Sequence, residues 1–288
     1  LGDVYKRQVF EGGAFRTIFS CGVMDALVEN DIMPDYMIGV SAGAAYGVSM
    51  ASKQPRRNLD VLMKYRNDKR YLGLSNMIDK DNKSIYGLEF SYETIPNELN
   101  LFDYDAFKQY KGDFYCVVTN LLTGQPEYMK YTGDDRTNTV LKATCALPML
   151  FPPIIINDVP YMDGGLSDSI PYLKAIEDGC DRIIVVLTRQ SGYTKTTSRS
   201  TKAIAYSYRN QYPKLTETML TRASRYNESL KGLDQYVKEG RIITIQPTTS
   251  KGFSRLEKDK NKILSMYNDG YNQCYELLDT IKEFYGIK

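Results

Sequence analysis

Short apolar runs alternate with segments of helical periodicity along the first two thirds of the chain. Apolar runs and turn residues predict strands over residues 9–10, 36–40, 114–119, 127–131, 183–187 and 242–245, with a hairpin over 154–161. Helical patterns cover residues 19–27, 42–52, 58–66, 139–146 and 256–284, the last with a break at Gly270, and a further helix begins at Ser169. Residues 68–110 show no clear period. This alternation predicts an α/β fold, a mostly parallel sheet covered by helices on both sides.

Composition places the chain among globular proteins. Of its 288 residues, 42% are hydrophobic and 25% charged, and the net charge of +2 gives no electrostatic reason to expect a nucleic-acid partner. The longest uncharged run, Tyr36 to Ser52, holds three Gly and three Ser. A membrane span needs about 20 predominantly apolar residues, so this run does not predict one.

The five cysteines have no CxxC spacing, and most stand among apolar neighbours, as Cys116 does. We interpret them as reduced packing residues, which is typical of a cytoplasmic protein. The first eight residues show no apolar segment of a signal peptide. We therefore expect a cytoplasmic location.

The chain contains no histidine. This excludes Ser-His-Asp and Cys-His catalysis and any His-ligated metal, and we expect no metal and no cofactor. A G-x-S-x-G pattern nevertheless joins the strand at 36–40 to the following helix, with Gly39 and Gly43 on either side of Ser41. Such a turn exposes the serine hydroxyl above the sheet and directs a helix N-terminus at developing negative charge. The alternative is a tight turn in which the glycines serve only close packing.

A serine needs a base to take its proton, and without histidine the base must be Asp, Glu or Lys. Asp163 follows the hairpin and precedes Gly164 and Gly165, which permit positive φ and close backbone approach. The alternative is a plain β-turn. Asp168 is a competing base, which we interpret instead as part of a helix N-cap together with Ser169.

A glycine loop, Glu11-Gly-Gly-Ala-Phe-Arg16, leads from the first strand into a helix. Its amides suit either a phosphate-binding loop or an oxyanion hole. The dinucleotide pattern G-x-G-x-x-G fails, because Ala14 and Thr17 replace its later glycines, and no Gly-Lys-Ser/Thr is present. Arg16 either pins the loop, adds positive charge to it or is an ordinary surface residue.

Three stretches in this order resemble the patatin-like phospholipases: residues 11–16, residues 38–44 with the elbow, and the run 146–153 that continues to Asp163-Gly-Gly165. The resemblance covers roughly residues 8–190. It implies a three-layer α/β/α sandwich and a Ser–Asp dyad that cleaves fatty-acyl esters through an acyl-enzyme. The implied roles are nucleophile for Ser41, base for Asp163, oxyanion hole for the amides of Gly12, Gly13 and Ala14, and support for Arg16, Gly39, Gly43, Gly164 and Gly165.

The resemblance also implies a domain plan: a catalytic core over residues 1–190 and a C-terminal helical extension with one further strand over residues 191–288, packed on the core. Two features depart from the family pattern. The loop of the family is Gly-Gly-Gly-x-Arg-Gly, whereas Ala14 and Thr17 stand here, and the bulkier residues predict an oxyanion hole that is narrower or differently arranged. Lys6-Arg7-Gln8 stands where an apolar strand is expected, which favours a non-native start over residues 1–8.

The implied substrate is a phospholipid or another acyl ester. A basic, Tyr-rich tract over residues 182–216 suits transient contact with an anionic membrane surface, or is simply a solvated face. Residues 71–101 form either a lid or connecting structure. With the same dyad, a thioesterase, a carboxylesterase or an acyltransferase are alternatives, and a catalytically inactive lipid-binding module is another. A dinucleotide-binding oxidoreductase is disfavoured by the failed glycine pattern.

Overall fold

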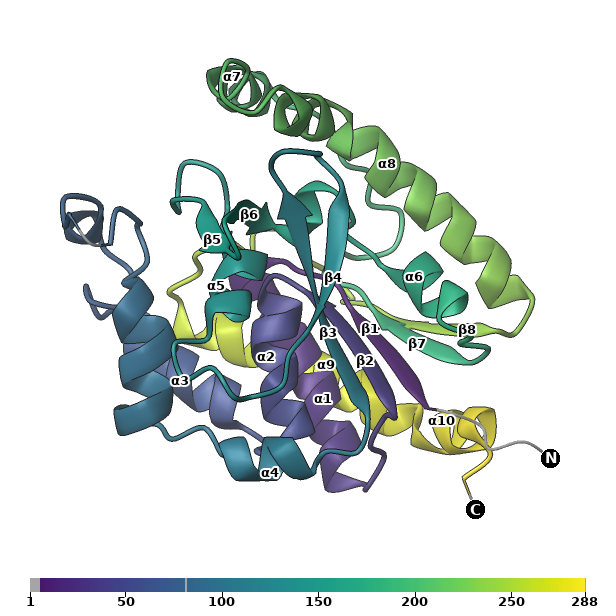
Figure 1. Cartoon of the computed structure of the whole chain (residues 1–288). Coiled ribbons are helices and arrows are strands. Elements are labelled where there is room, and N and C mark those ends of the chain that lie inside the picture. The colour runs from purple at the N-terminus through teal and green to yellow at the C-terminus, as the bar shows by residue number, and fades with distance from the viewer. Residues whose placement is uncertain (1–5, 81, 288) are drawn as a thin grey trace.

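The computed structural model describes residues 6–80 and 82–287, and it has three layers, helices on both faces of one sheet (Figure 1). The sheet has eight strands. They are β1 (Arg7–Phe10), β2 (Tyr36–Val40), β3 (Asp113–Asn120), β4 (Pro126–Lys130), β5 (Ile154–Ile156), β6 (Val159–Asp163), β7 (Ile183–Val186) and β8 (Ile242–Ile245). This is the α/β sandwich with a mostly parallel sheet that the sequence predicts.

The strand order β5-β6-β3-β2-β1-β7-β8 has a parallel centre and an antiparallel edge. Strands β3, β2, β1, β7 and β8 run parallel, whereas β4 and β6 pair with β3 in the antiparallel sense. Phe10 lies opposite Gly39 of β2 and Val186 of β7. The loops that follow β1, β2 and β7 therefore leave the sheet at one edge, where α/β proteins place their ligands.

The described residues contain ten α-helices, three 3-10 turns and one ten-residue π-helix, η3. They are α1 (Ile18–Glu29), α2 (Ala42–Ala51), α3 (Arg57–Tyr65), α4 (Tyr104–Gln109), α5 (Thr139–Cys145), α6 (Tyr172–Glu177), α7 (Arg199–Ser207), α8 (Pro213–Lys238), α9 (Lys260–Glu276) and α10 (Leu278–Tyr285), with η1 (Ala14–Thr17), η2 (Leu74–Met77), η3 (Phe90–Leu99) and η4 (Gly164–Leu166). Helices α1, α2 and α9 lie on one face, and α6 and α8 on the other (Figure 1).

Alternation along the strands divides the core between the two faces. In β1, Phe10 packs with the α1 side and Val9 with the α8 side. In β7, Ile184 belongs to the first cluster and Val185 to the second. Both sets are fully buried, which explains why these strands read as continuous apolar runs in the sequence.

The C-terminal helices correct one prediction. The break falls at Leu277, between α9 and α10, and Gly270 lies inside α9. A Cβ at Gly270 would lie 2.0 Å from the carbonyl oxygen of Phe19, and one at Gly22 would lie 2.1 Å from that of Tyr267. These two glycines let α1 and α9 pack backbone against backbone, so Gly270 serves close packing rather than a helix end.

Two further predictions were wrong or incomplete. Helix α6 begins at Tyr172 with Pro171 as its N-cap, and the Ser169 hydroxyl donates to the Gly165 carbonyl at 2.8 Å instead of capping it. Asp168 accepts a hydrogen bond from the Tyr128 hydroxyl at 2.9 Å.

Helix α8 was not predicted, although its buried residues, Leu215, Met219, Ala223, Tyr226 and Leu233 among them, follow a helical period.

The division at residue 190 stays a prediction. Strand β8 lies in the same sheet as β7, and α9 packs along α1. The C-terminal part therefore completes layers that the first part begins. Of the segment over residues 1–8, Arg7 and Gln8 open β1 and Lys6 precedes it, and residues 1–5 lie outside the described residues.

Candidate active site

Ser41 occupies the turn between β2 and α2. Its φ of 55° and ψ of −128° are unusual for a residue with a side chain, so the backbone strain of the elbow lies on the serine itself. A Cβ at Gly43 would lie 2.5 Å from the Phe10 carbonyl oxygen. The small residue lets α2 begin directly beside β1, which holds Ser41 at the carboxyl edge of the sheet.

Asp163 ends β6 and is almost fully buried, with 2% of its surface exposed. The Gly165 amide donates to its Oδ1 at 2.8 Å, and the Ser41 hydroxyl also hydrogen bonds to its carboxylate. Burial raises the pKa of Asp163, while the Ser41 hydrogen bond and the charge of Arg222 act in the opposite direction. Arg222, from α8, donates through Nε to the Gly165 carbonyl. The structure thus brings Ser41 and Asp163 into contact.

The two glycines after Asp163 show one of the two predicted features, close backbone approach, and lack the other, positive φ. Neither Gly164 nor Gly165 has a positive φ. A Cβ at Gly164 would lie 2.1 Å from the Val117 carbonyl oxygen, so its role is the close approach of η4 to β3. Close packing of this turn fixes the direction in which the Asp163 carboxylate points.

The glycine loop lies directly against Ser41. A Cβ at Gly12 would come within 2.8 Å of the Ser41 Cβ. Ala14 adopts a φ of 51°, a conformation that glycine adopts at less cost. Among the hydrogen bonds within residues 6–80 and 82–287, none has the amide of Gly12, Gly13 or Ala14 as donor. These donors remain available to an oxyanion.

Two residues beside Ser41 escaped the sequence analysis. The Thr144 hydroxyl accepts the Ser41 amide at 2.9 Å, so this amide is already engaged within the protein. The Cys145 thiol hydrogen bonds with Ser41, and burial raises its pKa to about 12, so it is a neutral neighbour. Both precede the Ala146-Leu-Pro motif, and that adjacency was the only signal available. All five cysteines are buried and unpaired.

Ser41 stands where two cavities meet. The first, of about 130 Å³, is lined mostly by apolar and tyrosine side chains, including Tyr46, Val48 and Phe151. The second, of about 220 Å³, is lined by polar and charged groups. Ser41, Ala14 and Leu147 line both. This division fits a molecule with an apolar chain on one side of its reacting bond and a polar group on the other.

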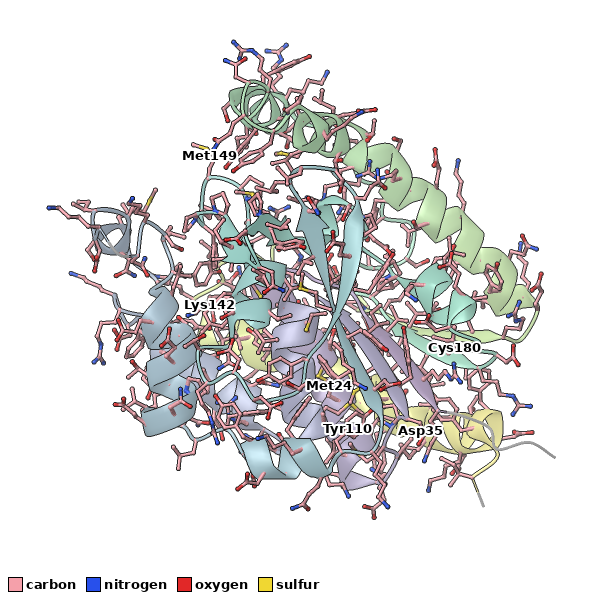
Figure 2. All side chains as sticks on the ribbon, in the orientation of Figure 1. Met24, Asp35, Tyr110, Lys142, Met149 and Cys180 are labelled. Atoms are coloured by element: carbon pink, nitrogen blue, oxygen red, sulfur yellow. The ribbon has the colours of Figure 1, made fainter. Side chains whose placement is uncertain are left out.

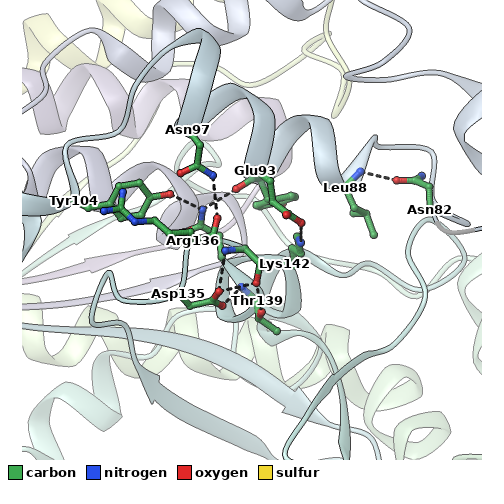
Figure 3. Close-up of polar contacts among 12 residues, drawn as sticks. Asn82, Leu88, Glu93, Asn97, Tyr104, Asp135, Arg136, Thr139 and Lys142 are labelled. Carbon is green, nitrogen blue, oxygen red and sulfur yellow. Dashed lines mark hydrogen bonds and ion pairs between the residues drawn. The ribbon is translucent and has the colours of Figure 1, made fainter.

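The wall of the apolar cavity comes from the segment without a clear sequence period. Tyr92, Ile95 and Pro96 of η3 line it. An ion pair between Lys142 of α5 and Glu93 holds η3 in place, and the Asn97 side chain donates to the Arg136 carbonyl at 3.1 Å (Figure 3). Within residues 71–101, η3 is therefore a packed wall on this side of the site, whereas Leu74 and Ile78 are exposed.

The polar cavity contains the predicted residue Arg16, which is only 6% exposed. Arg16 is therefore not a surface residue, and its buried Nε has no hydrogen-bond partner within the described part of the chain. Burial and the nearby Arg189 and Arg255 lower the pKa of Arg16 to about 10. Met149 is exposed and lies near α7 (Figure 2), and its amide donates to the Tyr208 hydroxyl at 3.3 Å.

The structure offers no evident place for a metal ion: among the residues it describes, acidic and cysteine side chains nowhere gather in a set of three with ligating geometry. Within the same residues, every helix is too short or too polar to cross a bilayer.

Comparison with known families defines the class of protein. The model of the patatin-like phospholipase family matches residues 9–176, more than half of the 288 residues, and the chain belongs to this family. A second model, a domain of unknown function designated DUF6363, matches residues 212–286.

Individual relatives share the first part of the chain. The Escherichia coli K12 protein YjjU is 28% identical over 192 residues, which cover 62% of this chain and 51% of YjjU. Lysophospholipase nte1 of Aspergillus terreus is 29% identical over 189 residues, covering 62% of this chain and 11% of that protein. The match thus spans about half of the bacterial relative and about a tenth of the fungal one. The crystal structure of VipD from Legionella pneumophila superposes with a TM-score of 0.49 at 14% identity, covering 96% of this chain and 67% of that one.

Proposed function

We propose that this protein is a serine lipid acyl hydrolase of the phospholipase A or lysophospholipase type. The observation that carries the proposal is the position of Ser41, which hydrogen bonds to the buried Asp163 at the junction of an apolar and a polar cavity. Membership in the patatin-like phospholipase family and the lysophospholipase name of the fungal relatives support it.

In the proposed reaction, the Ser41 hydroxyl attacks the ester carbonyl carbon while Asp163 takes its proton. An ordinary aspartate is a weak base with a pKa of about 4. Burial raises the pKa of Asp163 and so strengthens it, while the Arg222 charge keeps it from becoming permanently protonated. The Gly165 amide holds one carboxylate oxygen, which leaves the other for the proton.

The tetrahedral intermediate carries a negative oxygen. The amides of Gly12, Gly13 and Ala14 supply the donors for it, each worth about 3 kcal/mol in comparable sites. Collapse expels the alcohol, which receives the proton from Asp163, and leaves the fatty acid esterified to Ser41. Water, deprotonated by Asp163, then attacks this ester and releases the acid. The apolar cavity holds the acyl chain throughout.

The test is labelling by a fluorophosphonate, which reacts only with an activated serine, combined with ester hydrolysis. Labelling maps to Ser41 and is absent in Ser41→Ala. Asp163→Asn lowers kcat by at least a hundred-fold, because removal of a general base costs about 10² to 10⁴. Asp168→Asn, which alters another buried carboxylate five residues along the chain, retains labelling.

Near-normal turnover in Asp163→Asn would overturn the dyad. A folded protein that no fluorophosphonate labels would favour an inactive lipid-binding module. Thioesters cleaved in preference to oxygen esters of the same chain would favour a thioesterase.

A further inference from the structure

The polar cavity beside Ser41 has a large excess of positive charge. Five cationic side chains line it: Arg16, Arg189, Lys195, Arg222 and Arg255. Glu11 and Asp163 are the carboxylates that line it with them. Within residues 6–80 and 82–287, none of the five cations forms an ion pair with a carboxylate. Arranging so many cations around one cavity is electrostatically unfavourable unless an anion enters it.

The two carboxylates offset only part of this charge, because two negative groups stand against five positive ones, and each carboxylate also accepts hydrogen bonds from neutral donors. Glu11 accepts the Thr188 amide at 2.7 Å, and the Tyr226 hydroxyl donates to its other oxygen at 2.8 Å. Asp163 accepts the Gly165 amide and the Ser41 hydroxyl. An excess of positive charge therefore remains on the lining of the cavity.

The cations are also positioned by other parts of the fold. Lys195 lies in a loop that exchanges two backbone hydrogen bonds with the Asn227 side chain, at 2.8 and 2.9 Å, and its ammonium stands 3.8 Å from the centre of the Tyr226 ring. Arg222 is fixed to the Gly165 carbonyl. The carbonyl of Arg255 accepts the Phe15 amide at 3.1 Å, which joins its segment to the glycine loop. Burial and neighbouring positive charges lower the pKa of Lys195 to about 7, as expected for a cation in a field of like charge.

We propose that this cavity binds the phosphate monoester headgroup of a single-chain acyl-ester substrate, and that Lys195, Arg222 and Arg255 select for it. The inference rests on the proposed function and names its substrate class. A doubly charged phosphate matches the forked guanidinium groups of arginine. A choline headgroup fits poorly, because its quaternary ammonium would meet the same cations. Tyr193, the aromatic side chain on the lining, already has the Arg189 guanidinium 4.4 Å from the centre of its ring.

These selecting residues lie outside the family match, which ends at residue 176. Arg222 and Arg255 fall within residues 212–286, the segment matched by the domain of unknown function. We therefore assign the arginine contacts to the headgroup to that segment and the Lys195 contact to the loop before it, while the first part of the chain supplies the elbow and the proposed base.

The kinetic test compares three oleoyl esters below their micelle concentrations: lysophosphatidic acid, lysophosphatidylcholine and monooleoylglycerol. The expected kcat/KM for lysophosphatidic acid exceeds each of the others by at least ten-fold. Lys195→Met and Arg255→Gln each reduce the ratio of lysophosphatidic acid to monooleoylglycerol by about ten-fold. Lys202→Gln, which removes an exposed charge of α7 outside the cavity, preserves the ratio. Equal kcat/KM for the three esters, with Ser41 still labelled, would overturn the headgroup assignment and leave the proposed function standing.

A binding test is independent of catalysis. The Ser41→Ala protein is titrated by calorimetry with glycerol 3-phosphate and with inorganic phosphate. The same titrations are repeated with the double variant that carries Ser41→Ala and Lys195→Met. We expect glycerol 3-phosphate to bind and to weaken at least ten-fold in the double variant. Absence of binding would refute the site even if the enzyme cleaves esters. Binding of inorganic phosphate without any kinetic preference for lysophosphatidic acid would show a free-anion site and overturn the assignment to a substrate headgroup.

Discussion

Replacing Arg222 by glutamine tests whether a charge from α8 controls the proposed base. Arg222 and Asp163 both lie close to Gly165. A Cβ built on Gly165 would be 3.0 Å from Asp163 Oδ1 and 3.4 Å from an Arg222 terminal nitrogen, which places those two atoms at most about 6.4 Å apart. Arg222 is thus a positioning residue that acts through Asp163, and its charge lowers the pKa of that carboxyl.

The magnitude follows from Coulomb's law. For unit charges about 6.4 Å apart at an effective dielectric constant of about 20, the attraction is about 2.6 kcal/mol. Loss of this attraction raises the pKa of Asp163, so the carboxyl stays protonated up to a higher pH and cannot accept the Ser41 proton. We expect Arg222→Gln to shift the acidic limb of kcat/KM to higher pH and to lower activity there by more than ten-fold.

The assay is hydrolysis of a short nitrophenyl ester from pH 4.5 to 9, read at the isosbestic wavelength of nitrophenol. Arg222→Lys serves as the matched variant, since it keeps the charge and loses the guanidinium hydrogen bond to the Gly165 carbonyl. If the charge of Arg222 controls the pKa of Asp163, the acidic limb of kcat/KM in Arg222→Lys lies close to that of the original protein. An equal displacement in both variants would indicate a structural role, and an unmoved limb in Arg222→Gln would refute the reasoning.

Two further predictions concern packing and the polar cavity. Gly270→Ala lowers the free energy of unfolding by about 1 to 3 kcal/mol, because its Cβ would overlap the Phe19 carbonyl, whereas Asn268→Ala on the exposed face of α9 is neutral or slightly stabilising. Helix propensity alone predicts that both variants are stabilised, so thermal unfolding of the two variants distinguishes close packing from helix propensity. Sulfate, whose charge is constant from pH 6 to 9, inhibits ester hydrolysis less as Lys195 loses its proton near pH 7. In Lys195→Met, we expect sulfate inhibition to show no such weakening near pH 7. If inhibition by sulfate still weakens near pH 7 in that variant, Lys195 is not the group whose deprotonation causes it.

Local signals predicted the elbow and the turn at Asp163 well. The strand at 36–40 and the elbow glycines are contiguous in sequence, and the structure has β2 at Tyr36–Val40 with Ser41 directly after it. The motif predicts the local structure here because each glycine allows a close backbone approach, either within one turn of the chain or with the adjacent strand. The same locality misled the analysis at Gly270, whose contact is with Phe19, far away in sequence.

Long-range electrostatics escaped the sequence for a different reason. Lys195 lies in the basic tract over residues 182–216, whose sequence suits an anionic membrane surface or a solvated face alike, and nothing near Arg222 or Arg255 in sequence distinguishes them from solvated surface cations. Their common direction arises only when the loop before α7, helix α8 and the segment before α9 meet beside Ser41. Periodicity identifies which face of a helix is buried, but it does not show which cavity a polar side chain on that helix enters.

The arrangement of the cations bears on how the two halves of the chain depend on each other. The region matched to the patatin-like family contains Ser41, Asp163 and the glycine loop, and of the five cavity cations it contains only Arg16. The C-terminal part adds β8 beside β7 and packs α9 on α1, so the sheet and one helix layer need it for completion. Because that part also bears Arg222, whose charge acts on Asp163, residues 212–286 contribute both to the proposed headgroup selection and to control of the proposed base. Variation of residues 212–286 would then change substrate preference and pH dependence together, without any change at Ser41.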